Sequence, residues 1–104
     1  MSKIQLNSGI LFDFANPTED MFRLEDIAHS LSQLPRFTGH STQPVYVADH
    51  CVNVSLHIPS DYAKEGLMHD AAEAYLGDMS SPLKSMLPDY KQMERKVERL
   101  LAKR

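Results

Sequence analysis

Hydrophobic and polar residues follow two different periods along this chain. Between residues 3 and 14 they alternate around Asn7-Ser8-Gly9, whose residue types tolerate the positive φ of a tight turn. From residue 24 onward, apolar residues instead recur every three or four positions, which is the period of an α-helix. The pattern therefore predicts a mostly α protein with a short N-terminal β-hairpin.

Proline and glycine mark most ends of the expected helices. The first helix covers residues 24–34, because a proline follows and forces the residue before it out of the α region. The second is expected over residues 45–58, which also precede a proline. The third is predicted to run unbroken over residues 60–76, with Ser60 as its N-cap and Gly77 as its C-terminal stop.

A short helical turn over residues 81–86 and a last helix that begins near Pro88 complete the chain. The last helix carries apolar residues on one face: Tyr90, Met93, Val97, Leu100 and Leu101. An exposed apolar surface of several hundred Å² normally recruits a partner. We therefore expect a homodimer or a higher homo-oligomer whose interface uses this face.

Composition narrows the class of protein further. The 104 residues are 42% hydrophobic and 24% charged, which suits one domain with one modest core. The formal net charge of −3 argues against generic nucleic-acid binding, which needs a basic surface. No apolar stretch approaches the roughly 20 residues of a membrane span. With one cysteine, Cys51, and no signal-peptide pattern, the expected location is the cytoplasm.

Histidines and acids gather in two predicted helices. His69 and Asp70 are adjacent, Glu73 follows one turn later, and His50 lies on the preceding helix. An antiparallel pairing of these helices would bring His50 beside His69. Imidazole and carboxylate together suit a divalent cation such as Mn²⁺, Co²⁺, Fe²⁺ or Zn²⁺. The alternative for any single histidine is a hydrogen-bonded packing role.

Four segments carry a resemblance to a known family: LPRFTGHS, YVADH, GLMHDAAEAYLGDMSSPLK and LPDYKQME. They resemble the HD-domain phosphohydrolases, and most closely the bacterial and phage branch that is similar to 5'-deoxynucleotidases. The resemblance covers nearly the whole chain and implies an HD-domain helical bundle that holds one divalent metal ion (Mn, Co, Fe, Zn or Mg). Its signature is a histidine, then a His-Asp pair, then a further aspartate.

The resemblance implies a role for each matching residue at the metal centre. His50, His69 and Asp70 match the metal ligands, and Glu73 matches the catalytic carboxylate that assists proton transfer. Asp78 matches the acid of a Gly-Asp pair that shapes the nucleotide pocket, and we place it with Glu73 among the catalytic residues. Asp78 could instead be only the polar residue that follows the helix stop.

The resemblance also implies substrate-binding residues. Arg36 and Phe37 match an Arg-aromatic pair that contacts phosphate and sugar, and His40 and Lys84 match the motifs of this branch. A guanidinium can bind two phosphate oxygens at once, and an aromatic ring can cover a sugar or base. The alternatives are a surface cation for Arg36, a core residue for Phe37 and a solvated cation for Lys84.

One departure concerns the last aspartate ligand, which the family supplies from a helix downstream of the LPDYKQME segment. This chain ends at Arg104 before such a helix, so we expect residues 1–104 to form a single, shortened HD domain. Water, a partner chain or His40 would then complete the site. The alternatives are a shortened relative with weak or no activity, and a fragment of a longer protein.

The expected activity is hydrolysis of the 5'-phosphate of small (deoxy)nucleotides, most simply nucleoside monophosphates, by metal-activated water. A truncated module that binds nucleotide or a partner protein without turnover is the alternative. The same chemistry on a triphosphate or an oligonucleotide messenger stays open as well.

Overall fold

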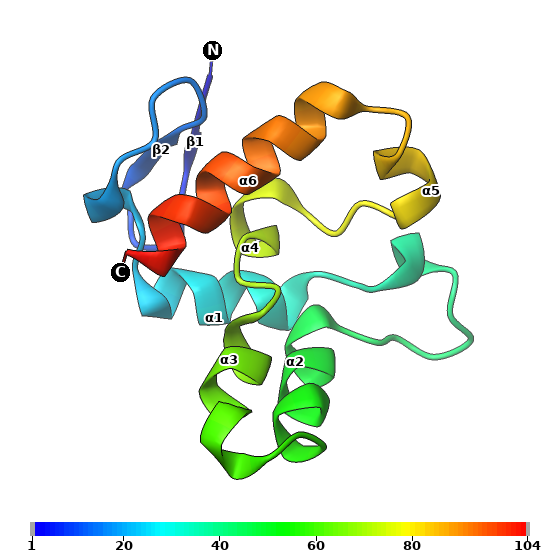
Figure 1. Ribbon diagram of the computed structural model, residues 1–104. Coiled ribbons are helices and arrows are strands. Elements are labelled where there is room, and N and C mark those ends of the chain that lie inside the picture. Colours follow the sequence, from blue (N-terminus) through cyan, green and yellow to red (C-terminus); the bar gives the residue numbers. More distant parts are fainter. Residues whose placement is uncertain (1, 104) are drawn as a thin grey trace.

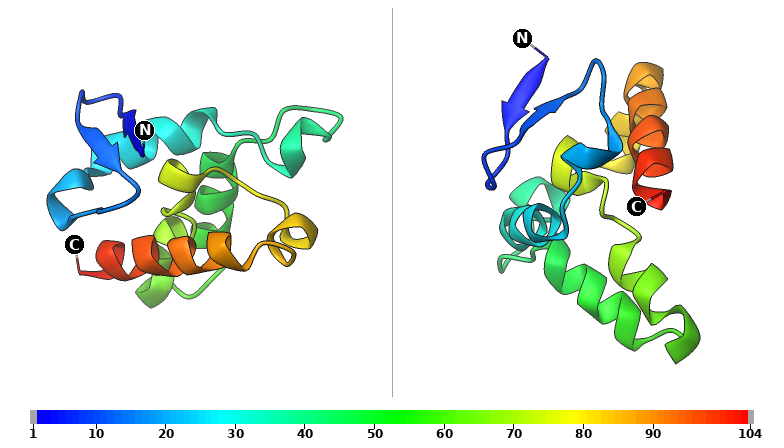
Figure 2. Two further views of the ribbon diagram at one scale, coloured as in Figure 1. Left: turned by 90° about the horizontal axis from the view of Figure 1, so that it is seen from above. Right: turned by 90° about the vertical axis from the view of Figure 1, so that its left-hand side faces the viewer.

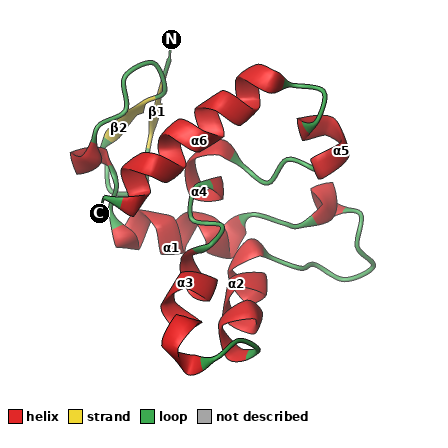
Figure 3. Ribbon diagram, in the orientation of Figure 1, coloured by secondary structure: helices red, strands yellow, loops and turns green. Residues whose placement is uncertain are grey.

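The computed structural model describes residues 2–103, which form a mostly helical structure with one two-stranded antiparallel sheet (Figure 3). Its helices are α1 (Leu24–Gln33), α2 (Val47–Leu56), α3 (Ala63–Met68), α4 (Glu73–Leu76), α5 (Ser81–Lys84) and α6 (Pro88–Ala102). Three short 3₁₀ turns are η1 (Glu19–Met21), η2 (Phe37–Gly39) and η3 (Ser60–Tyr62). The predicted class is confirmed, and every helix of residues 2–103 is too short or too polar to cross a membrane.

The N-terminal hairpin forms as predicted from β1 (Lys3–Gln5) and β2 (Leu11–Asp13), with Ile4 opposite Phe12. Its turn needs Gly9, whose φ of +95° is a conformation that side chains with a Cβ rarely adopt. Phe12 points inward and is fully buried. The hairpin therefore serves as one wall of the hydrophobic core.

A buried carboxylate ties the hairpin turn to α1. Asp26 is 4% exposed and accepts two hydrogen bonds from Ser8, one from its backbone N–H at 2.8 Å and one from its hydroxyl at 2.6 Å. A buried carboxylate requires such partners, because leaving it without them costs a large desolvation free energy. The sequence pattern gave no sign of this contact, since the two residues lie 18 positions apart.

Aromatic rings fill the centre of the core. The ring of Tyr75, on α4, stacks on Phe12 with centroids 4.7 Å apart and meets the edge of Phe22 at 4.9 Å. Val97 of α6 closes the cluster from the other side and is fully buried. Figure 1 shows α4 lying between α1 and α6, so both of its neighbours hold it in place.

The apolar face of α6 packs on the core of its own chain. Val97 is fully buried, and Met93, Leu100 and Leu101 pack against the core residues. Val97 is therefore not available to an interface between copies, and less of this face is free than the sequence indicates. The homo-oligomer itself stays a prediction.

Helices α2 and α3 form an antiparallel pair that projects from the rest of the molecule (Figures 1 and 2). α2 packs mainly against α3. Gly66 lies at their contact and is buried, and a Cβ added there would stand 2.6 Å from Ile58 Cδ1 and 3.3 Å from Ser55 Cα. The absence of a side chain at Gly66 thus allows the close approach of the two helices.

The predicted continuous helix over residues 60–76 is wrong, because the chain breaks it into η3, α3 and α4. Between α3 and α4, backbone N–H groups donate to carbonyls three residues back, as in Ala71 to Met68 at 3.0 Å and Glu73 to Asp70 at 2.9 Å. This tighter winding lets the small residues Ala71 and Ala72 enter the core. Ser60 is not an N-cap but the first residue of η3.

The C-terminal part of that region follows the prediction. Gly77 ends α4 with a φ of +86°, and its N–H donates to the carbonyl of Glu73 at 2.8 Å. A serine hydroxyl of α1, from Ser30, donates to the carbonyl of Ala74 at 2.8 Å and attaches α4 to α1. These contacts fix the orientation of the short α4 segment.

The loop between α1 and α2 is closed at its base. Pro35 and Tyr46 form an isolated antiparallel bridge, and Val47 donates its N–H to the carbonyl of Leu34 at 2.8 Å. Inside the loop, Phe37 and Thr38 both have positive φ values, of 57° and 53°. Non-glycine residues rarely adopt this conformation, and it occurs preferentially beside functional sites.

Candidate metal centre

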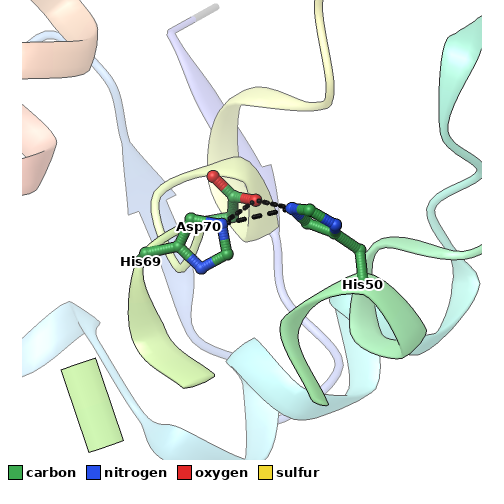
Figure 4. Close-up of side chains that lie close together, drawn as sticks. All are labelled: His50, His69 and Asp70. Atoms are coloured by element: carbon green, nitrogen blue, oxygen red, sulfur yellow. Dashed lines mark hydrogen bonds and ion pairs between the residues drawn. The ribbon is translucent and has the colours of Figure 1, made fainter. Parts of the chain in front are cut away.

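His50, His69 and Asp70 converge on one point from two elements (Figure 4). His50 comes from the middle of α2, and His69 and Asp70 directly follow α3. The Nε2 atoms of the two histidines are 3.3 Å apart, and Oδ2 of Asp70 lies 3.5 Å from His50 Nε2 and 2.9 Å from His69 Nε2. The antiparallel pairing of α2 with α3 thus brings together the three predicted metal ligands.

The spacing of these atoms suits a bound divalent cation. With metal–ligand bonds of about 2.1 Å, neighbouring ligand atoms are about 3.0 Å apart in an octahedron and about 3.4 Å apart in a tetrahedron. The three observed separations, from 2.9 to 3.5 Å, cover this range. Two imidazole nitrogens with one carboxylate oxygen are ligands that Mn²⁺, Co²⁺, Fe²⁺ and Zn²⁺ accept. The donor set therefore fits the metal ion that the sequence predicts.

A backbone carbonyl orients His69. Its Nδ1–H donates to the carbonyl of Gly66 at 2.6 Å, since a carbonyl can only accept. The lone pair of the neutral ring is then on Nε2, the atom that points at His50 and Asp70. Metal-binding histidines commonly have such a second partner, which fixes the tautomer. Sequence analysis missed Gly66, although a glycine inside a helix three residues before a ligand is a signal of a close backbone approach.

The surroundings keep His50 in its metal-binding form. Partial burial lowers the pKa of His50, and the positive charge of Arg36 lowers it further, against a smaller opposing effect of Asp70. The neutral imidazole is therefore favoured, and only the neutral ring has a free lone pair for a metal ion. The side chains of His50, His69 and Asp70 are 26%, 36% and 25% exposed, so an ion and a small ligand can reach them.

Glu73 and Asp78 form an acidic cluster next to the metal ligands. Burial raises the pKa of Glu73 most, followed by a hydrogen bond with Asp70 and by the charges of Asp70 and Asp78. The tight winding explains the contact, because residues three apart eclipse one another in a 3₁₀ turn. Glu73 is thus placed to hold a proton beside the centre, as the sequence predicts, and Asp78 lies close by.

Arg36 and Phe37 border a pocket on the loop side of the centre. The guanidinium of Arg36 lies 4.5 Å from the centre of the Phe37 ring, and that ring is 55% exposed. A pocket of about 260 Å³ is lined by Arg36, Phe37, Thr38, Asp78, Met79, Ser80, Ser81 and Pro82. Asp78 of this pocket follows Gly77, whose N–H donates to the carbonyl of Glu73, so the pocket is connected to Glu73 through the end of α4.

The other two predicted substrate-binding residues lie differently. Lys84 donates from Nζ to Oε2 of Glu94 on α6 at 2.8 Å, so a partner within the chain already engages its ammonium. His40 is exposed at the end of η2, and it does not belong to the His50–His69–Asp70 group, the one metal-binding cluster among residues 2–103. The structure therefore does not bring His40 to the centre as a replacement ligand.

Two curated bacterial proteins are similar to this chain. The protein of Escherichia coli K12 named "Uncharacterized protein YfdR" is 45% identical over 101 residues, which cover 97% of this chain and 57% of that protein. An uncharacterized protein of Rhodobacter capsulatus is 34% identical over 89 residues, which cover 77% of this chain and 45% of that protein. The chain spans about half the length of these relatives, and no family model matches it.

Proposed function

We propose that this chain is a metal-dependent phosphohydrolase of the HD type that removes the 5'-phosphate of small (deoxy)nucleotides, in the simplest case nucleoside monophosphates. The observation that carries the proposal is the group of His50, His69 and Asp70, with three ligand atoms spaced for one divalent ion. The adjoining pocket with its arginine and the buried carboxyl of Glu73 support a phosphate ester as substrate.

Each residue then has a defined task. His50, His69 and Asp70 would hold the ion, which when bound supplies a Lewis acid and lowers the pKa of a coordinated water. Arg36 binds the phosphate through two parallel N–H donors, a geometry that an ammonium cannot provide. The exposed ring of Phe37 lies at the same pocket and covers the sugar or the base.

Glu73 carries the proton-transfer step in this proposal. Its half-buried carboxyl, which holds a proton more tightly than an exposed glutamate, can deliver that proton to the leaving oxygen of the ester. The negative charge of Asp78 helps to raise the pKa of Glu73 and so keeps the proton on its carboxyl group. Glu73 is the first residue of α4, and Asp78 lies just beyond its C-terminal end. The positions of both acids therefore depend on that short helix.

The test is a screen of metals against nucleotides. The full chain is stripped with a chelator, reloaded singly with Mn²⁺, Co²⁺, Fe²⁺, Zn²⁺ or Mg²⁺, and incubated with a panel of ribo- and deoxynucleotides while released phosphate is measured. We expect release that depends on the metal and is abolished in Asp70→Asn. Metal and nucleotide binding without any phosphate release would overturn the proposal in favour of a binding module.

A further inference from the structure

Three side chains of α5 and α6 form a connected group at the edge of the acidic cluster. Lys84 donates to Glu94 at 2.8 Å, and its ammonium lies 5.9 Å from the centre of the Tyr90 ring. The side chains of Lys84 and Glu94 are 24% and 19% exposed, so water screens this ion pair less than a surface pair. We refer to Lys84, Tyr90 and Glu94 as the α5–α6 brace.

The brace reaches the end of α4. The hydroxyl of Tyr90 donates to the carbonyls of Leu76 and Gly77, each at 3.4 Å. These carbonyls belong to the last helical turn, which has no helical N–H partners of its own. Asp78 follows directly, and the N–H of Gly77 donates to the carbonyl of Glu73. One aromatic ring therefore links α6 to the segment that begins with Glu73 and ends with Asp78.

Charge interactions also connect the residues of the brace with Glu73 and Asp78. The hydrogen bond with Glu94 is the largest of the effects that raise the pKa of Lys84, and the charges of Glu94, Tyr90 and Glu73 add to it. Burial raises the pKa of Tyr90, and the charges of Glu73 and Asp78 act in the same direction. The ion pair with Glu94 thus fixes the position of the Lys84 ammonium, and the charge of Glu73 raises its pKa by a smaller amount.

We propose that Lys84, Tyr90 and Glu94 are positioning residues that hold Glu73 and Asp78 in place beside the metal ligands. This inference rests on the proposed function, and it gives Lys84 a different task from the substrate-binding role that the resemblance implies. A lysine has a long, flexible side chain, so without Glu94 its ammonium would no longer occupy one place. Glu94 therefore acts through Lys84, whose ammonium lies against Tyr90, and Tyr90 in turn bonds the carbonyls at the end of the Glu73–Asp78 segment.

The kinetic test compares Glu94→Gln with a matched control, Glu98→Gln, which changes an exposed glutamate of the same helix. We expect Glu94→Gln to lower kcat roughly ten-fold, because a small misplacement of a catalytic group has a large effect, while KM changes less than about two-fold. Metal affinity stays the same, because the three ligands lie outside residues 73–78. Glu98→Gln leaves all three quantities unchanged.

A double-mutant cycle separates positioning from general damage to the fold. In a Lys84→Met background, Glu94→Gln should cost no further activity, since Glu94 acts through Lys84. Glu94→Asp, which keeps the charge, should restore part of kcat. Independent, additive losses in the double variant, or a loss of metal affinity in Glu94→Gln, would overturn the brace.

A measurement that needs no activity distinguishes this inference from the proposed function. Reductive methylation with ¹³C-formaldehyde labels the lysines of the full chain, and the Lys84 signal is identified by its absence in Lys84→Arg. Its pKa should fall in Glu94→Gln and, by a smaller amount, in Glu73→Gln, but not in Glu98→Gln. If Glu94→Gln leaves it unchanged, the ion pair that holds Lys84 is absent and the brace is refuted, even if the protein releases phosphate. If the pKa falls as expected and no nucleotide is hydrolysed, only the proposed function fails.

Discussion

At the residue scale, the central feature is a short stretch of backbone in which polar side chains face α2 and the neighbouring apolar side chains enter the core. His69 and Asp70 must face α2, whereas Ala71, Ala72 and Tyr75 must enter the core. A regular α-helix turns 100° per residue, and the tighter 3₁₀ turn found here changes which side chains align. The consequence is that Glu73 is bonded through its N–H to the carbonyl of Asp70, and that the charge of Asp70 helps to raise the pKa of Glu73.

Glu73→Gln should separate metal binding from turnover. Glutamine has nearly the same shape and keeps a hydrogen-bonding group near Asp70, so the metal content should stay the same. The proton that Glu73 delivers is lost, so the rate of phosphate release should fall by about 10²-fold or more. Metal analysis and a phosphate assay on one preparation measure both, with Glu65→Gln on the exposed side of α3 as the control. If Glu73→Gln loses its metal, then Glu73 is a ligand.

At the scale of elements, the α2–α3 pair positions the three residues of the candidate metal centre. α2 contributes His50, and the end of α3 contributes His69 and Asp70, so the separation of the two helices sets the separation of the ligands. Gly66 is where the helices come closest, and its carbonyl also orients His69. Gly66 therefore affects both the packing of α2 against α3 and the orientation of a proposed metal ligand.

Gly66→Val should damage stability and metal affinity together. Its Cβ would lie 3.3 Å from the backbone of Ser55 as well as 2.6 Å from the end of Ile58, so α2 and α3 must move apart. Overpacking of this kind costs about 1–3 kcal/mol, and the two histidines should separate as the helices do. Gly66→Ala should show a smaller effect, and Lys64→Val on exposed α3 surface serves as the control. Normal metal affinity in Gly66→Val would show that helix separation does not set the site.

The contact between hairpin and α1 provides a prediction about stability alone. Ser8→Ala removes the 2.6 Å hydrogen bond to the buried carboxylate of Asp26 and should lower the free energy of unfolding by about 1–3 kcal/mol. Ser32→Ala, which removes a hydroxyl that bonds only within exposed α1 surface, should change it by less than about 0.5 kcal/mol. Urea denaturation measures both. Equal values for the two variants would mean that the contact adds nothing to stability.

At the scale of the whole molecule, a bound ion would join parts of the fold that otherwise meet only through packing. α2 with α3 projects from the body, and the chain from Asp70 into α4 connects this projection to the core (Figure 1). Anything that binds the folded protein and not the unfolded chain stabilises it in proportion to the logarithm of its concentration. Binding of the metal ion should therefore raise the free energy of global unfolding.

Metal addition should raise the melting temperature of the chelator-treated protein. At a free concentration of 100 times Kd, the gain is about 2.7 kcal/mol, which corresponds to a shift of roughly 10 °C or more for a domain of this size. His50→Ala should lose the shift, whereas His57→Ala, an exposed histidine at the end of α2, should keep it. A shift that survives in His50→Ala would place the ion at another site.

The sequence predicted the class, the hairpin and most helix ends, because prolines, glycines and the period of apolar residues determine these locally. Through a resemblance and the pairing of consecutive helices, it also predicted that His50, His69 and Asp70 would lie together. It missed the break after α3, because the pull of Ala71 and Ala72 into the core is a tertiary effect. It did not indicate the ion pair of Glu94 with Lys84, because nothing local shows that these two residues would lie together.

The bridge between Pro35 and Tyr46 has a consequence for how this molecule could be altered. The loop enters and leaves the body at a single closed point, with Val47 bonded to Leu34, so α1 and α2 do not depend on what lies between. Loops whose ends are close tolerate changes of length at little entropic cost. Residues 39–44, beyond the pocket residues Arg36, Phe37 and Thr38, are accordingly the part of this loop whose length can change while the base of the loop stays closed.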